Sequence, residues 1–188
     1  FMDVISADMA GKTMGVATMG TALTPEHVQQ LARVAQRILL VYDGDEAGQK
    51  AAKRAITLIR THAQQVEIGI VHLPDQLDPD DLRIQRGTAA LQQALEQNIQ
   101  TPVEFLVNAA RTGKNLSNQV QYLAFLQEVM QTLQQATPVE QDLQLTKIAN
   151  EFGTSKQALQ AQLQQTLAQS RARPSATQNY SKRTPKTY

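Results

Sequence analysis

The feature that most constrains this chain is an uninterrupted apolar run at residues 38–42, followed directly by Asp43-Gly44-Asp45. Such a run, rich in strand-forming residues, predicts a central strand that is buried on both faces of a parallel sheet. Periodicity then predicts a helix over residues 46–63 and a second strand over residues 66–73. A strand, a helix and a strand joined by short connections predict a parallel α/β fold.

Upstream of this run, the pattern predicts a short helix over residues 4–10 and a short strand over residues 15–18. Thr24, Pro25 and Glu26 then supply an N-cap, a proline at the first helical position and an early acidic residue. This order is typical of a helix start, so a helix is predicted over residues 25–37.

After residue 87 the pattern predicts helices and no strand. Helical spacing occurs over residues 89–99, 103–111, 118–135, 139–152 and 156–169. In the longest of these helices, the apolar stripe consists of Leu123, Leu126, Met130 and Leu133. We therefore expect an α/β domain over residues 1–86, a helical bundle subdomain over residues 87–169 and a disordered basic linker over residues 170–188.

Composition excludes several classes of protein. The chain has no cysteine, which excludes a disulfide scaffold, a cysteine-ligated zinc site and a thiol nucleophile, and fits a reducing compartment. Its apolar runs are far too short to span a bilayer, and no signal peptide is recognisable. The formal charge of +1 conceals an asymmetry, because residues 168–188 carry five basic residues and no acid. The first 167 residues therefore carry 13 basic against 17 acidic residues.

Two acidic pairs follow the two predicted strands. Asp43 and Asp45 follow the first strand, and Asp78 and Asp80 follow the second. In open α/β sheets ligands bind beyond the carboxyl ends of the strands, and alternate residues of an extended chain face the same way. Convergent carboxylates without histidine or cysteine suit a hard cation, Mg²⁺ or Mn²⁺. The alternative is that these aspartates are only turn and helix-cap residues.

Four short motifs resemble those of bacterial replicative DNA primases. DGDEAG at residues 43–48 is similar to the DGDxAG element of the Toprim fold, which primases share with topoisomerases, some nucleases and recombination proteins. FMDV at residues 1–4, GTALT at residues 20–24, and LP at residues 73–74 followed by DPD at residues 78–80 resemble primase elements in the primase order. These motifs cover roughly residues 1–86.

The resemblance implies a Toprim-type parallel sheet and synthesis of short RNA primers on single-stranded DNA by two-metal nucleotidyl transfer. It implies catalytic roles for Asp43 and Asp45, and Mg²⁺ or Mn²⁺ ligation by these two residues together with Asp78 and Asp80. Asp75 and Asp81 are nearby alternatives to the second pair. The residues matched to substrate binding are Thr21, Lys50, Lys53 and Arg54, although the three cations also fit an ordinary solvated helix face.

The implied partners are a single-stranded DNA template, ribonucleoside triphosphates, the RNA primer and a replicative helicase, in the cytoplasm and without a membrane. In the family, a catalytic Glu lies two residues before the position of Phe1, and a zinc module lies further upstream. We therefore expect zinc only outside this chain, no primer synthesis by this chain alone, and helicase contact through a C-terminal domain absent here. Alternatives are a non-catalytic Toprim module that binds metal or nucleic acid, or a Toprim topoisomerase or nuclease; the GTALT and LP…DPD motifs argue against the latter two.

Overall fold

The computed structural model describes residues 2–12, 14–18, 20, 22–42 and 45–172. The chain divides into two compact units, Phe1–Thr132 and Leu133–Tyr188. The domain limits expected from the sequence stay predictions. None of the helices within the described ranges combines the length and the apolar character that crossing a membrane requires.

A three-stranded sheet organises the first unit. β1 (Arg37–Val41) pairs in parallel with β2 (Glu67–Val71), and β2 pairs antiparallel with the two-residue β3 (Ile99–Gln100). The predicted parallel pair is confirmed, but two expectations are wrong. The sheet is mixed, with a strand after residue 87, and β2 rather than β1 occupies its centre among the described strands. At this edge position the side chain of Leu39 is 37% exposed, so β1 is not buried on both faces.

The predicted helix between the two parallel strands is α3 (Glu46–His62). Its buried residues are Gly48, Ala52, Ala55, Ile56 and Ile59. From the sequence, helical spacing predicts the inward residues Ala47, Ala51, Ala55, Leu58 and Ile59. Ala47 is exposed, because the buried face is rotated by about one residue. Alanines lie on several sides of this helix, so the apolar pattern alone left its orientation poorly determined.

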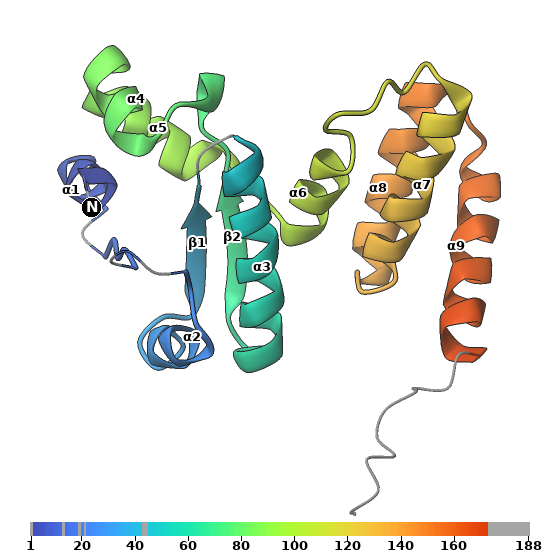
Figure 1. Cartoon of the computed structure of the whole chain (residues 1–188), viewed down its shortest axis with the longest axis horizontal. Helices are drawn as coiled ribbons and strands as arrows, with labels where there is room; N and C mark the ends of the chain where they lie inside the picture. The colour runs from blue at the N-terminus through green and yellow to red at the C-terminus, as the bar shows by residue number, and fades with distance from the viewer. Residues whose placement is uncertain (1, 13, 19, 21, 43–44, 173–188) are drawn as a thin grey trace, which may run out of the picture. The chain divides into compact units, whose positions relative to one another are not determined.

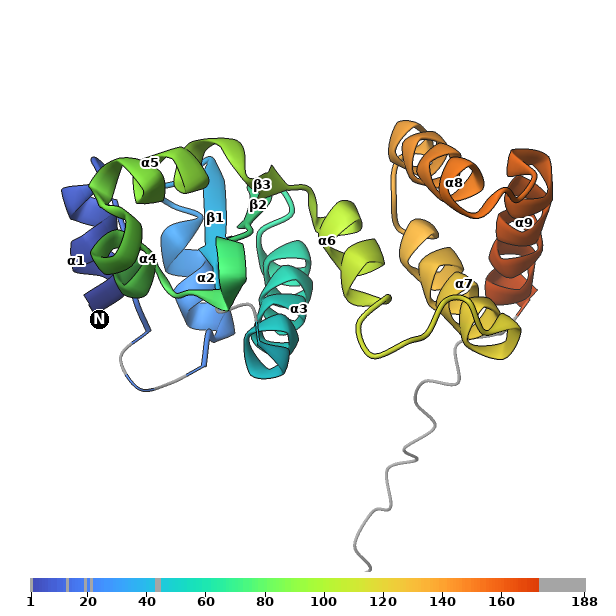
Figure 2. The ribbon, with the colours of Figure 1, turned by 90° about the horizontal axis from the view of Figure 1, so that it is seen from above.

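Helices cover both faces of the sheet (Figures 1 and 2). On one face, Leu40 of β1 and Ile70 of β2 pack with α2 (Pro25–Leu31) and α3. On the other face, Val71 of β2 packs with α1 (Met2–Met9), α4 (Pro79–Arg86) and α5 (Thr88–Gln97). Ile70 and Val71 are neighbours in sequence, and their opposite directions follow from the alternation of side chains along a strand. The first unit therefore has a helix–sheet–helix arrangement.

A capping residue followed by proline begins four helices. Thr24, Asp78, Thr101 and Thr137 are the N-caps of α2, α4, α6 (Pro102–Ala109) and α8 (Pro138–Phe152). In each, the capping oxygen accepts a hydrogen bond from a backbone N–H two or three residues into the helix, and proline occupies a position whose N–H needs no partner. The predicted helix over residues 25–37 is shorter than expected, because α2 ends at Leu31 and residue 37 begins β1.

Three further elements complete the described chain: the short 3₁₀ turn η1 (Pro74–Gln76), α7 (Gln119–Leu133) and α9 (Lys156–Ala172). Residues 15–18, predicted as a strand, form no strand. α9 extends into the stretch predicted as a disordered linker, of which residues 173–188 lie outside the described residues.

The apolar faces of the last three helices differ in part from the prediction. On α7, Phe125, Val129 and Met130 are buried, whereas Leu123 is 56% exposed and does not belong to the buried stripe. In the second unit, α8 and α9 contact each other, and their buried apolar residues are Leu145, Ile148, Ala149, Leu159 and Leu163.

Candidate functional site

The acidic segments follow the carboxyl ends of the two parallel strands, which lie at the same end of the sheet. β1 and β2 are parallel and end in register, with Val41 opposite Val71. Asp45 follows β1 as the N-cap of α3, and Asp78 follows β2 as the N-cap of α4. Asp43 and Thr21, both predicted site residues, lie outside the described residues.

Asp45 is exposed and is oriented by the helix that it begins. Its Oδ1 accepts a hydrogen bond from the backbone N–H of Gly48 with an N···O distance of 2.6 Å. The backbone of Asp45 is extended (φ −76°, ψ 175°), as expected at an N-cap. Asp45 therefore caps a helix, as the alternative interpretation of the sequence predicted, and it uses one of its two carboxylate oxygens to do so.

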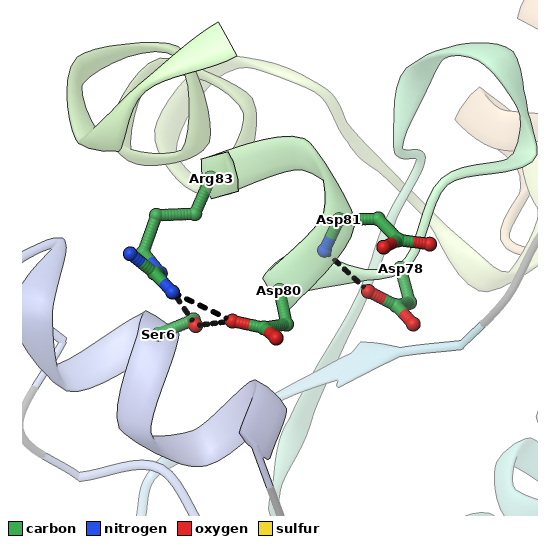
Figure 3. A network of polar contacts seen from close by, with 5 residues as sticks. All are labelled: Ser6, Asp78, Asp80, Asp81 and Arg83. Atoms are coloured by element: carbon green, nitrogen blue, oxygen red, sulfur yellow. Dashed lines mark hydrogen bonds and ion pairs between the residues drawn. The ribbon is translucent and has the colours of Figure 1, made fainter. Parts of the chain in front are cut away.

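Asp78 has the same arrangement at the next strand. Its Oδ1 accepts a hydrogen bond from the backbone N–H of Asp81, also with an N···O distance of 2.6 Å (Figure 3). Pro79 follows it at the first position of α4. Asp45 and Asp78 are thus equivalent caps on helices that follow two parallel strands.

Asp80 points elsewhere. Its Oδ1 accepts one hydrogen bond from the hydroxyl of Ser6 on α1 at 2.6 Å and another from Nη2 of Arg83 at 2.9 Å (Figure 3). These contacts, that of Ser6 first, hold the pKa of the Asp80 carboxyl below its ordinary value. Asp78 and Asp80 therefore have different partners, and the extended-chain argument for an i, i+2 pair does not apply to them, because Pro79 begins a helix between them.

The neighbouring acids, Asp75 and Asp81, have other contacts than the helix-capping carboxylates of Asp45 and Asp78. Asp75 has a left-handed backbone (φ 55°), and its exposed carboxylate forms an ion pair with Arg86. Asp81 is exposed and contributes its backbone N–H to the cap. Asp75 thus connects η1 to the end of α4, and the backbone of Asp81 takes part in the cap at the start of α4.

The described carboxylates include donors of the kind that a hard cation binds. Carboxylate oxygens are the ligands that hard divalent cations prefer, and among the described contacts Asp45 and Asp78 each use only one of their two oxygens. No group of three His, Asp or Glu residues with metal-binding geometry occurs in the described part of the chain. The donor chemistry of these two carboxylates therefore fits a divalent cation, although the described residues alone form no group of three such ligands.

The predicted phosphate-binding cations lie along α3. Lys50 forms an exposed ion pair with Glu46 at 2.6 Å, and the hydrogen bond from this lysine lowers the pKa of Glu46. Lys53 and Arg54 line an open depression of about 360 Å³ together with Thr57 and Leu58. Of the three cations, Lys53 and Arg54 therefore border this depression, whose lining is mostly apolar.

Two residues at the site were missed by the sequence-based prediction. Ser6 is fully buried on α1, 74 positions before its partner Asp80, and no local pattern signals such a contact. Arg83 is three residues after Asp80 on one helix, a spacing at which opposite charges meet. That ion pair could have been predicted from the sequence once α4 was recognised.

Two family models match consecutive parts of the chain. A model described as Toprim-like matches residues 1–83, and one described as the DnaB-helicase binding domain of primase matches residues 103–157. The DNA primase of Enterococcus faecalis is 37% identical over 166 residues, which are 88% of this chain and 26% of the relative. The chain thus spans about a quarter of the length of the curated relatives it matches.

Solved primase structures have a similar fold. The RNA polymerase domain of Mycobacterium tuberculosis primase DnaG, in complex with a double-stranded DNA oligomer with a 6-nucleotide overhang, is 30% identical with a TM-score of 0.63. That alignment covers 82% of this chain and 50% of the other. A DnaG primase catalytic domain bound to single-stranded DNA is 26% identical with a TM-score of 0.55, covering 84% and 50% of the two chains.

The second family model changes one expectation. Helicase contact was expected only through a domain outside this chain. The match at residues 103–157 finds similarity to a helicase-binding domain within it, over α7, α8 and all but the first residue of α6.

Proposed function

Since the chain belongs to the bacterial DNA primase family, we propose that it forms part of an enzyme that synthesises short RNA primers on single-stranded DNA. The observation that carries this proposal is the order of the two matches, Toprim-like and then primase helicase-binding, along one chain. The reported relatives are primases, so a Toprim topoisomerase or nuclease is not favoured. Primer synthesis is proposed for the complete protein. This chain would supply the aspartates that follow the carboxyl ends of the two parallel strands.

Asp43, Asp45, Asp78 and Asp80 would hold Mg²⁺ or Mn²⁺. Such a cation, when bound, neutralises phosphate charge and aligns the reacting oxygens in nucleotidyl transfer. Asp45 and Asp78 support this role best, because each has a carboxylate that caps a helix just after the carboxyl end of a parallel strand. Asp80 could contribute its Oδ2, since its Oδ1 accepts hydrogen bonds from Ser6 and Arg83.

The chain's own cations would bind the triphosphate and the nucleic acid backbone. Lys53 and Arg54 line the open depression on α3 and offer positive charge to phosphate oxygens. Lys50 would contribute when it leaves Glu46, since an exposed pair of this kind is weak. Thr21 is proposed only from its place in the GTALT motif.

The proposed partners are the single-stranded DNA template, ribonucleoside triphosphates, the RNA primer and the replicative helicase, in the cytoplasm. Two of the similar solved structures are complexes with double-stranded or single-stranded DNA, which supports the nucleic acid partners. The match at residues 103–157 supports a helicase contact made by α6, α7 and α8.

Titration with Mn²⁺ tests the cation site. Isothermal calorimetry should show binding to the wild-type chain and none to the double variant Asp43→Asn with Asp45→Asn. Asparagine keeps the capping acceptor at position 45, so α3 should still form. Asp8→Asn with Asp142→Asn, which removes the same two charges at exposed positions, is the matched control and should bind like the wild type. Equal titration of the wild type and the double variant would contradict the metal assignment.

A further inference from the structure

Ser6, Asp80 and Arg83 form a closed triangle of hydrogen bonds between α1 and α4, which we name the latch (Figure 3). The Ser6 hydroxyl donates to Oδ1 of Asp80 and accepts from Nε of Arg83 at 2.8 Å. Nη2 of Arg83 closes the triangle on the same Asp80 oxygen. Every member contacts both of the others, so the loss of one disturbs the remaining pair.

The latch is shielded from solvent. Ser6 is fully buried, and the side chains of Arg83 and Asp80 are 23% and 20% exposed. The ion pair of Lys50 with Glu46, in contrast, is 71% and 79% exposed. Hydrogen bonds to charged groups are stronger than neutral ones, and solvent screens them less when they are sheltered. The latch therefore restrains α4 against α1 more firmly than an ordinary surface pair would.

The restrained turn of α4 also carries Asp78. Asp78 is the N-cap and Asp80 lies two positions later, within the first turn. The Asp78 carboxylate takes its direction from the N–H of Asp81 in this same turn. A shift of the turn would therefore move the Asp78 carboxylate with it.

We infer that Ser6 and Arg83 are positioning residues for the cation site, acting through Asp80 to hold the first turn of α4 where Asp78 faces that site. The inference rests on the proposed function, because it assumes a cation bound by Asp78. Neither Ser6 nor Arg83 offers a carboxylate, so both act without being ligands. Mutation of residues that orient metal ligands through hydrogen bonds typically lowers metal affinity by about 10- to 100-fold.

The sign of one measurement separates this role from a simple charge effect. If Arg83 only offset the charge of Asp80, its removal would leave more negative charge beside the cation and tighten binding. If Arg83 positions the turn, its removal weakens binding although a positive charge has been lost. Arg86→Gln makes the same charge change one turn further along α4, outside the latch, and is the matched control.

The experiment is Mn²⁺ titration followed by electron paramagnetic resonance on the wild type, Arg83→Gln, Ser6→Ala and Arg86→Gln. We expect about tenfold weaker binding for Arg83→Gln, a smaller weakening for Ser6→Ala, and no weakening for Arg86→Gln. Arg83→Lys, which keeps the charge and one donor, should recover part of the affinity. Circular dichroism at the titration temperature verifies that each variant is folded.

Unchanged or tighter binding in both latch variants would overturn the inference while leaving the proposed function intact. Absence of Mn²⁺ binding by the wild type would overturn both. Should Arg83→Gln fail to fold, Ser6→Ala decides the question alone, because it removes a single oxygen atom and leaves every charge in place.

Discussion

Leu39 on β1 lies directly opposite Gly69 on β2, and a Cβ at position 69 would stand only 2.7 Å from Cδ2 of Leu39. On the other side, the same Cβ would stand 2.8 Å from Cγ2 of Ile99 on β3. Two neighbouring side chains thus close over the glycine from both flanking strands. The leucine can rotate away, but the β-branched isoleucine has little freedom at this atom.

We expect Gly69→Ala to destabilise the first unit by about 1 to 3 kcal/mol, the usual cost of overpacking. Urea denaturation measures this difference. Adding Ile99→Ala should recover part of the loss, because it removes the less mobile neighbour, so the double variant should lose less than the sum of the single ones. An unchanged free energy of unfolding in Gly69→Ala would show that the strands separate easily at this point.

The stability of the first unit should depend on acid through Asp80. The hydrogen bonds from Ser6 and then Arg83 hold the pKa of this carboxyl below its usual 3.8 in the folded chain. A carboxyl with a lower pKa when folded stabilises the fold above the unfolded pKa, and this contribution is lost as pH falls through the folded pKa. Ser6→Ala should raise the pKa of Asp80 and reduce the loss of stability below about pH 4.

Carboxyl chemical shifts of Asp80 and urea denaturation at several pH values measure both effects. Ser117→Ala, at an exposed position, is the control and should leave the Asp80 titration unchanged. A titration of Asp80 identical in wild type and Ser6→Ala would mean that the hydroxyl does not stabilise the ionised carboxylate.

Capping and charge can be separated at Asp45. Asp45→Ala removes the acceptor for the Gly48 N–H and should cost about 1 kcal/mol of unfolding free energy. Asp45→Asn keeps an acceptor and should cost much less, while both variants lose the carboxylate. Thermal unfolding compares the two; equal destabilisation by both would show that charge, rather than the cap, stabilises the start of α3.

The second unit offers an independent test at Thr137. Its hydroxyl accepts from the N–H of Glu140, and the Glu140 carboxylate accepts from the N–H of Thr137, which together form a capping box. Thr137→Ala should destabilise α8 by about 1 kcal/mol. Thr146→Ala, inside the same helix, should be neutral or slightly stabilising, because alanine has the higher helix propensity. Hydrogen exchange of α8 amides distinguishes these outcomes.

Local signals made much of this fold predictable. The apolar run before Asp43 and the periodicity after it predicted β1, α3 and β2, and the cap–proline pair Thr24-Pro25 predicted the start of α2. β3 was not predictable, because two residues carry no periodicity and pair only once α5 has returned the chain to the sheet. The central position of β2 likewise depends on that distant pairing.

The sequence predicted where the acidic residues of the candidate site lie, but not which way the side chain of Asp80 points. Asp45 and Asp78 follow parallel strands as expected, since strand ends can be located from sequence. The direction of Asp80 depends on where α4 begins and on Ser6, which comes from another part of the chain. A contact of this kind leaves no trace in local spacing.

Asp45 and Asp78 share one further property. Each carboxylate is held 2.6 Å from a backbone nitrogen of the helix that it begins, so its rotamer is selected before any ligand arrives. Ordering a free side chain opposes binding through lost conformational entropy. For these two carboxylates, folding has already done the ordering. Fraying of the first turn of either helix would therefore lower affinity for a ligand even with every aspartate still in the chain.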